Sequence, residues 1–267
     1  MRIRVPDTLT ADNSEKYEVS IRLWPDGLSF SGYIPHVPDS FFSEKVLFDD
    51  DVNLAQSLKN IFFDNPSFSF MYKSLYVICV SEKYTLVPDN VYTEKGKDLL
   101  FSFCHQKRET GRVLIQQVED LQSTLLFEVD NEAYEFMMRS LVMPRFIHYL
   151  SPLMLSWQKN SFSHFPKQIY SYIHDGILDI VCFEHGDMLF ANSFSFEKDN
   201  DIIYFIMYTC RQLGVNQVDD SLYFCGDDTM CNSVMSVIKE YISHADYMPS
   251  LNTDVYFDVK TLTGCVL

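Results

Sequence analysis

Two pairs of neighbouring segments are predicted to form β-strands, with apolar and polar residues alternating in 17–24, and an Asp-Gly turn joins the members of each pair. The pairs are 17–24 with 28–34, joined through Asp26-Gly27, and 168–174 with 177–184, joined through Asp175-Gly176. Alternation with a period of two is typical of β-strands, and Asp-Gly favours a tight turn between antiparallel strands. The pattern predicts a β-hairpin in each half of the chain.

Each predicted hairpin is followed by the same series of elements: a third strand, an amphipathic helix and a largely apolar strand. The segments are 45–48, 52–62 and 74–80 after the first hairpin, and 188–196, 201–213 and 222–224 after the second. Apolar residues three and four positions apart mark both helices. We expect an α/β protein with two similar lobes from an internal duplication, each a mixed sheet flanked by helices. Two unrelated α/β halves are the alternative.

The remaining segments complete the division of the chain. Further strands are predicted at 83–88, 98–104, 112–118, 123–129 and 145–148, and further helices at 131–142, 151–161 and 229–243. Alternation at Val255, Phe257 and Val259 predicts an edge strand in the tail. We divide the chain into a polar lead-in at 1–16, an N-terminal lobe at 17–145 and a C-terminal lobe at 146–267.

Composition narrows the class of partner. The formal net charge of −16 argues against nucleic acid, whose phosphates require clustered Lys and Arg. The chain has no apolar run of about 18 residues and no apolar core of a signal peptide near residues 1–16, so we expect a cytoplasmic protein without a membrane span. The seven cysteines form no CxxC pair, which favours buried free thiols.

Several short motifs carry a family resemblance. They are Trp24-Pro25-Asp26-Gly27-Leu28-Ser29, Thr85-Leu86-Val87-Pro88, Leu189-Phe190-Ala191-Asn192-Ser193-Phe194, Asp201-Ile202-Ile203-Tyr204-Phe205 and Leu222-Tyr223-Phe224-Cys225-Gly226. These motifs resemble the DUF3822 family of Bacteroidetes proteins over about 17–243. The duplicated strand–strand–strand–helix–strand plan is similar to the superfamily of actin, sugar kinases and the Hsp70 ATPase, with ribonuclease H-like lobes. The resemblance implies an actin-like ATPase fold and no established activity.

An actin-like ATPase needs two phosphate-binding turns, each with an Asp on the strand that enters the turn. The carboxylates position Mg²⁺ and its water, and glycines let backbone N–H groups approach phosphate oxygens. In the first hairpin the resemblance places Arg22 at the Asp position, and Asp26-Gly27 follows too late in the sequence. The first turn lacks the expected carboxylate.

The second hairpin departs from the pattern in a different way. Gly176 and Asp179 align with the Gly and the Asp of the superfamily's Gly-Thr-hydrophobic-Asp-Val, which places Tyr172 at the position of the essential Asp. His174 and Asp175 then replace two glycines. A carboxylate beside phosphate repels it, and a side chain blocks the approach of the backbone.

A third element, the adenosine loop, usually has two small residues after a strand. Here the chain reads Gly226-Asp227-Asp228, which keeps one glycine and adds two carboxylates. We interpret the three changes as decay of a nucleotide site, with no catalytic residue assigned.

Two other groups of residues have alternative interpretations. Potential metal ligands gather on the second hairpin, at His174, Asp175, Asp179, Glu184, His185 and Asp187. Their spacings match no metal motif, so we expect ordinary turn residues and no metal. Aromatic residues crowd one loop, at Phe62, Phe63, Phe68, Phe70 and Tyr72. We expect them in the core; exposed, they would form a docking patch.

These observations favour a non-catalytic, actin-like binding or scaffold protein that has no cofactor and acts on a protein partner. At the level of fold it resembles the cytoplasmic scaffold components of pilus and secretion machines. The alternative is a divergent ATPase or phosphotransferase that binds ATP and Mg²⁺ between its lobes through Asp26, Asp175, Asp179 and Asp227.

Overall fold

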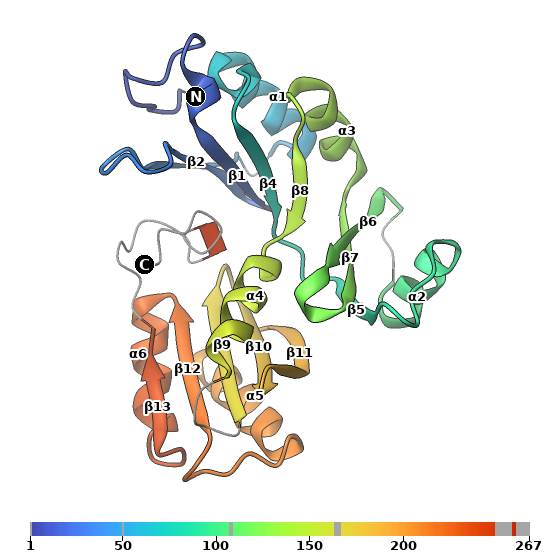
Figure 1. Cartoon of the computed structure of the whole chain (residues 1–267), viewed down its shortest axis with the longest axis vertical. Helices are drawn as coiled ribbons and strands as arrows, with labels where there is room; N and C mark the ends of the chain where they lie inside the picture. Colours follow the sequence, from blue (N-terminus) through green and yellow to red (C-terminus); the bar gives the residue numbers. More distant parts are fainter. Residues whose placement is uncertain (1, 50, 107–108, 163–166, 249–257, 260–267) are drawn as a thin grey trace. The chain divides into compact units, whose positions relative to one another are not determined.

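The computed structural model describes residues 2–49, 51–106, 109–162, 167–248 and 258–259 (Figure 1). The chain divides into two compact units, Met1–Ser151 and Pro152–Leu267. The boundary falls after Ser151, whereas the sequence-based division placed it after residue 145. The difference arises because the strand β8 (Arg145–His148) is hydrogen-bonded within the first sheet.

Unit 1 is built on a five-stranded sheet with the order β3-β2-β1-β4-β8. Its first four strands are β1 (Glu18–Trp24), β2 (Gly27–Tyr33), β3 (Phe42–Leu47) and β4 (Ser74–Cys79). Strands β1, β2 and β3 are antiparallel neighbours, whereas β1, β4 and β8 run parallel. The central strand β1 is buried on both faces, as expected for a strand covered by other elements.

The α-helices of unit 1 are α1 (Leu54–Asp64), α2 (Lys97–Cys104) and α3 (Asn131–Ser140), and short 3₁₀ helices occupy Ser14–Lys16, Pro66–Ser69, Glu94–Gly96 and Glu119–Leu121. Helices α1 and α3 lie beside the five-stranded sheet, whereas α2 lies beside the strand β5 (Tyr84–Pro88) (Figure 1). Asp130 caps α3, because its Oδ1 accepts a hydrogen bond from the Ala133 N–H at 2.9 Å. Helices α1 and α3 pack together, and the rings of Phe62 and Phe136 meet edge to face at 5.1 Å.

Unit 2 has the same architecture. Its strands are β9 (Lys167–His174), β10 (Ile177–Glu184), β11 (Asp187–Ser195), β12 (Ser221–Gly226) and β13 (His244–Tyr247), and its helices are α5 (Asp199–Gln212) and α6 (Asp228–Ile238). Helix α4 (Leu150–Asn160) begins at the end of unit 1 and continues into unit 2. There its Trp157 stacks on Tyr170 of β9, with 5.0 Å between ring centroids. Helices α5 and α6 pack against each other.

The two five-stranded sheets share one topology, because β3-β2-β1-β4-β8 corresponds to β11-β10-β9-β12-β13 with the same strand directions. The correspondence extends to register. Trp24, the last residue of β1, pairs with Gly27, and His174, the last residue of β9, pairs with Ile177. The expected pair of similar α/β lobes is confirmed.

Unit 1 also contains a three-stranded sheet in the order β5-β7-β6, inserted between β4 and α3. Its strands are β5 (Tyr84–Pro88), β6 (Gly111–Val118) and β7 (Ser123–Asp130). The predicted strand at 98–104 is wrong, since this segment forms α2 and packs on the small sheet. Only Phe101 is buried there, while Leu99 and Phe103 are 77% and 91% exposed. Periodicity cannot distinguish a strand from a helix in so short an apolar run.

The end of the chain also differs from prediction. The helix expected at 229–243 ends at Ile238, because the chain turns and adds β13 in parallel to β12. Two of the three residues of the expected tail strand, Val255 and Phe257, lie outside the described residues. Among the helices that the described residues form, none has the length and apolar character needed to cross a membrane.

The lead-in at 1–16 is more than a polar extension. Ile3 and Leu9 are buried, and the Ile3 N–H donates to Asn65 Oδ1 at 2.7 Å. The aromatic residues between 62 and 72 are predicted to lie in the core. This prediction is confirmed for Phe62, Phe68 and Tyr72, which are buried. Phe63, by contrast, is 89% exposed.

The contrast within α2 provides a test of the packing. Replacing Phe101 by Ala should lower the free energy of unfolding by about 3–5 kcal/mol, because it leaves a cavity against the three-stranded sheet. Replacing Phe103 by Ala should change it by less than about 0.5 kcal/mol, because the ring faces solvent. Urea denaturation monitored by circular dichroism measures both. Equal losses would contradict the packing of α2.

Candidate functional site

In the first hairpin, the side chain on the strand entering the turn is a cation. Arg22 is fully buried, and its Cζ lies 5.4 Å from the centroid of the Trp24 ring. Asp26 is exposed in the turn, where its carbonyl accepts a hydrogen bond from the Phe48 N–H at 2.8 Å. A Cβ at Gly27 would lie 2.6 Å from the Trp24 ring, so this position requires glycine. A buried guanidinium therefore occupies the position that the family resemblance assigns to a magnesium-binding carboxylate.

In the second hairpin, four side chains form a hydrogen-bonded group that we call the hairpin cluster: His174, Asp175, Asp179 and Ser193. His174 Nδ1 lies 2.9 Å from Asp175 Oδ2, and its Nε2 lies 2.9 Å from Asp179 Oδ2. The Ser193 hydroxyl donates to the second oxygen of Asp179. His174 is 5% exposed and Asp179 is fully buried.

The hydrogen bonds constrain the charge of the hairpin cluster. If both carboxylates are ionised they only accept hydrogen bonds, so both ring nitrogens of His174 donate and the imidazole is protonated. In that state one cation lies between two anions, and the excess negative charge repels phosphate. The Ser193 hydroxyl faces a carboxylate rather than the imidazole, so the serine and histidine are not arranged as nucleophile and general base.

Tyr172 fills the remaining space beside the hairpin cluster. Its ring stacks on the His174 ring, with 4.1 Å between centroids and 25° between planes, and the residue is 1% exposed. Because β1 and β9 reach their turns in the same register, Tyr172 and Arg22 occupy equivalent positions in the two units. Each unit therefore has a large buried side chain at this position, without a carboxylate.

The third element is the junction between β12 and α6. Gly226 has a φ of +112°, and a Cβ there would collide with the carbonyl oxygen of Ile173 on β9. Asp227 caps α6: its Oδ1 accepts the Met230 N–H at 2.9 Å, and its own N–H donates to the Ile173 carbonyl at 2.8 Å. This glycine and this carboxylate have clear structural roles in joining the strand to the helix.

The structure brings together four of the predicted residues in unit 2, namely Tyr172, His174, Asp175 and Asp179, with Gly176 in the turn at a φ of +74°. Sequence reasoning missed Ser193, which is 14 residues from Asp179 and faces it only because β10 and β11 pair in that register. In the part of the chain that the structure describes, no three His, Cys, Asp or Glu side chains are grouped to hold a metal ion.

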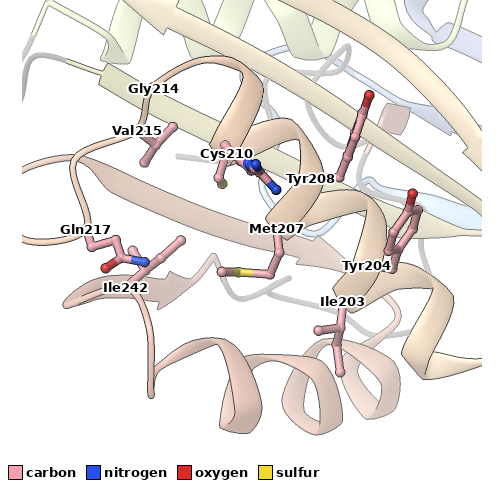
Figure 2. Close-up of a pocket in the computed structure, with 10 residues that line it drawn as sticks. Ile203, Tyr204, Met207, Tyr208, Cys210, Gly214, Val215, Gln217 and Ile242 are labelled. Atoms are coloured by element: carbon pink, nitrogen blue, oxygen red, sulfur yellow. The ribbon is translucent and has the colours of Figure 1, made fainter.

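A separate concave feature lies on the surface of unit 2 (Figure 2). It is a pocket of about 640 Å³ that we call the α5 pocket. Its lining comes from α5, from the loop that follows α5, and from Ile242 after α6. The side chain of Met207 extends toward Ile242 and Gln217 in Figure 2, whereas Tyr204 and Tyr208 project from another side of the helix.

Comparisons with known structures define the class of protein. A crystal structure from Bacteroides thetaiotaomicron, described as a protein with actin-like ATPase fold and unknown function, matches with a TM-score of 0.87 and 30% sequence identity, covering 96% of this chain and 99% of that chain. The PilM-PilN type IV pilus biogenesis complex matches with a TM-score of 0.51 and 8% identity, covering 86% and 87%. The chain has the actin-like ATPase fold.

The family follows from the sequence. The family described as "Protein of unknown function (DUF3822)" matches residues 6–245. The chain belongs to the DUF3822 family. No curated protein matches it.

The close approach of β12 to β9 gives a testable prediction. Gly226→Ala requires both a left-handed φ and a shift of the Ile173 carbonyl, so it should cost more than about 3 kcal/mol of stability. Gly214→Ala is the matched control, since Gly214 has a φ of +60° and open space around its Cβ position. It should cost only about 1–2 kcal/mol. Similar losses, measured by guanidinium denaturation, would show that contact with β9 is unimportant.

The hairpin cluster gives a second prediction. His174→Gln removes the cation between two carboxylates and should destabilise the protein by about 3–5 kcal/mol at pH 7, because Asp179 stays buried without its counter-charge. His185→Gln, in the exposed turn between β10 and β11, is the control and should change stability by less than about 0.5 kcal/mol. Thermal and urea denaturation measure both variants. A stability of His174→Gln equal to that of the control would contradict the charge assignment.

Proposed function

We propose that this protein is a non-catalytic member of the actin-like ATPase fold and works by binding a protein partner. The hairpin cluster is the observation that carries the proposal. It places a hydrogen-bonded group with excess negative charge at the turn where the fold would hold phosphate. A nucleotide would have to displace Tyr172, separate a buried ion pair, or both.

The first hairpin supports the same conclusion independently. Mg²⁺-ATP needs carboxylates on the strand to position the metal and its water, and Arg22 offers positive charge instead. The residues present at the two turns do not fit Mg²⁺-ATP, so we derive no chemical step through it.

Exposed apolar side chains support a role in binding. On α2, Leu99 and Phe103 are four residues apart on one face of the helix and are largely exposed. Exposed clusters of large apolar residues are typical of surfaces that bind other proteins. The net charge of −16 favours a protein partner over nucleic acid. PilM, in its complex with PilN, is a precedent for a chain of this fold within a protein assembly.

The state of the cysteines supports a cytoplasmic location. Among the described residues six cysteines are free thiols, and five of them are buried. Burial raises the pKa of the thiols of Cys182 and Cys210 to about 12, which keeps them protonated and unreactive. Free thiols in this number suit a reducing compartment.

Titration with nucleotide tests the proposal. Calorimetry with Mg²⁺-ATP or Mg²⁺-ADP should show no binding, and the melting temperature should stay within about 1 °C, because a ligand that binds the native state must raise it. Saturable binding of Mg²⁺-ATP would overturn the proposal. Its loss in Asp26→Asn, an exposed turn residue whose replacement should not affect folding, together with release of phosphate from Mg²⁺-ATP by the unchanged protein, would then support the alternative ATPase or phosphotransferase.

A further inference from the structure

We propose that the α5 pocket binds a small organic anion with an apolar body and a single carboxylate. The proposal does not depend on the absence of nucleotide binding, because the pocket and the hairpin cluster consist of different residues. It also adds a ligand class that differs from the protein partner proposed above.

The walls of the pocket are apolar and partly open. Ile203, Met207 and Val215 are half-buried around it, and Cys210 and Ile242 form a buried base. A volume of about 640 Å³ lies within the usual range of small-molecule sites. Apolar walls of this size favour a hydrocarbon or aromatic body and exclude a polyphosphate.

One cation stands at the rim of these walls. Arg211 is exposed, and the described part of the chain provides no carboxylate within ion-pairing distance of its guanidinium. The chain has a net charge of −16, so it repels anions on the whole. A guanidinium without a carboxylate partner among the described residues, beside an apolar pocket, therefore provides a local site that attracts an anion. Arg211 can hold a carboxylate through two parallel hydrogen bonds while the apolar body enters the pocket.

The groups that would oppose an anion are already occupied. The C-terminal end of α5 carries partial negative charge, and the Lys167 ammonium donates to the carbonyls of the two residues that follow the helix, Leu213 at 3.0 Å and Gly214 at 3.2 Å. The carboxylate of Asp220, near Cys210, is buried and accepts hydrogen bonds from the backbone N–H groups of Lys167 and Asn216 at 3.0 and 2.8 Å. The Cys210 thiol at the base is neutral.

The rim also offers neutral donors. Tyr204 and Tyr208 are 61% and 50% exposed, and their rings stack with 5.9 Å between centroids. Figure 2 shows both projecting from the same side of α5. With Arg211 they occupy positions i, i+4 and i+7 of the helix, which lie on one face.

Unit 1 provides an internal comparison. Its corresponding helices, α1 and α3, meet through the aromatic contact of Phe62 with Phe136, and Phe62 stacks on Phe68 at 4.4 Å. These rings occupy the space beside the helix. In unit 2, Cys210 of α5 and Val215 in the loop after it line the α5 pocket.

The proposal is tested on the full chain with three probes, octanoate, 1-octanol and octylammonium. They share an eight-carbon chain and differ in the charge of the terminal group. Calorimetry should show octanoate binding more tightly than 1-octanol by about tenfold, with octylammonium weakest, because only the carboxylate pairs with Arg211. Arg211→Gln should weaken octanoate by about tenfold and leave 1-octanol within about twofold.

Two further variants separate the pocket from non-specific effects. Val215→Trp should abolish binding of octanoate and 1-octanol by filling the pocket, with an unchanged far-ultraviolet spectrum as evidence of folding. Arg139→Gln removes an exposed arginine of unit 1, paired with Glu135, and should leave octanoate affinity unchanged. The proposal is overturned if octanoate does not bind, if the three probes bind equally, or if Arg211→Gln and Val215→Trp both bind octanoate like the original protein.

Discussion

The ion pair of His174 and Asp179 is the interaction on which the second unit's hairpin depends. Removing two charges from water costs several kcal/mol for each ion unless each finds its partner. In this protein both nitrogens of the imidazole and both oxygens of the Asp179 carboxylate are hydrogen-bonded, so the desolvation is offset locally. The same hydrogen bonds connect β9, β10 and β11. The electrostatics that hold the three strands together are also the basis of the proposal that this turn does not bind phosphate.

The two duplicated units have different buried side chains before their turns and keep the same sheet. The backbone topology of the two sheets is the same, because it depends on apolar alternation and turn geometry that both halves retain. The buried side chain before each turn is free to differ: a guanidinium over Trp24 in unit 1 and a tyrosine on His174 in unit 2. Each is accommodated by its own neighbours. The two units thus keep one backbone topology around different buried side chains.

The two proposed activities use different parts of this architecture. Docking of a protein would use apolar side chains that the three-stranded insertion exposes on α2. A small anion would use the α5 pocket of unit 2. The first of these features lies on the insertion that unit 2 lacks among its described residues.

The sequence by itself determined the two hairpins, their following helices and the repeated order of elements, because periodicity and Asp-Gly turns are local signals. It also located Tyr172, His174 and Asp179 on one hairpin. Only the tertiary structure decided that 98–104 is a helix, since one buried ring at Phe101 selects the conformation of a short apolar run. It alone placed Ser193 against Asp179 and opened the α5 pocket, because strand register and the fit of side chains between helices depend on residues distant in the chain.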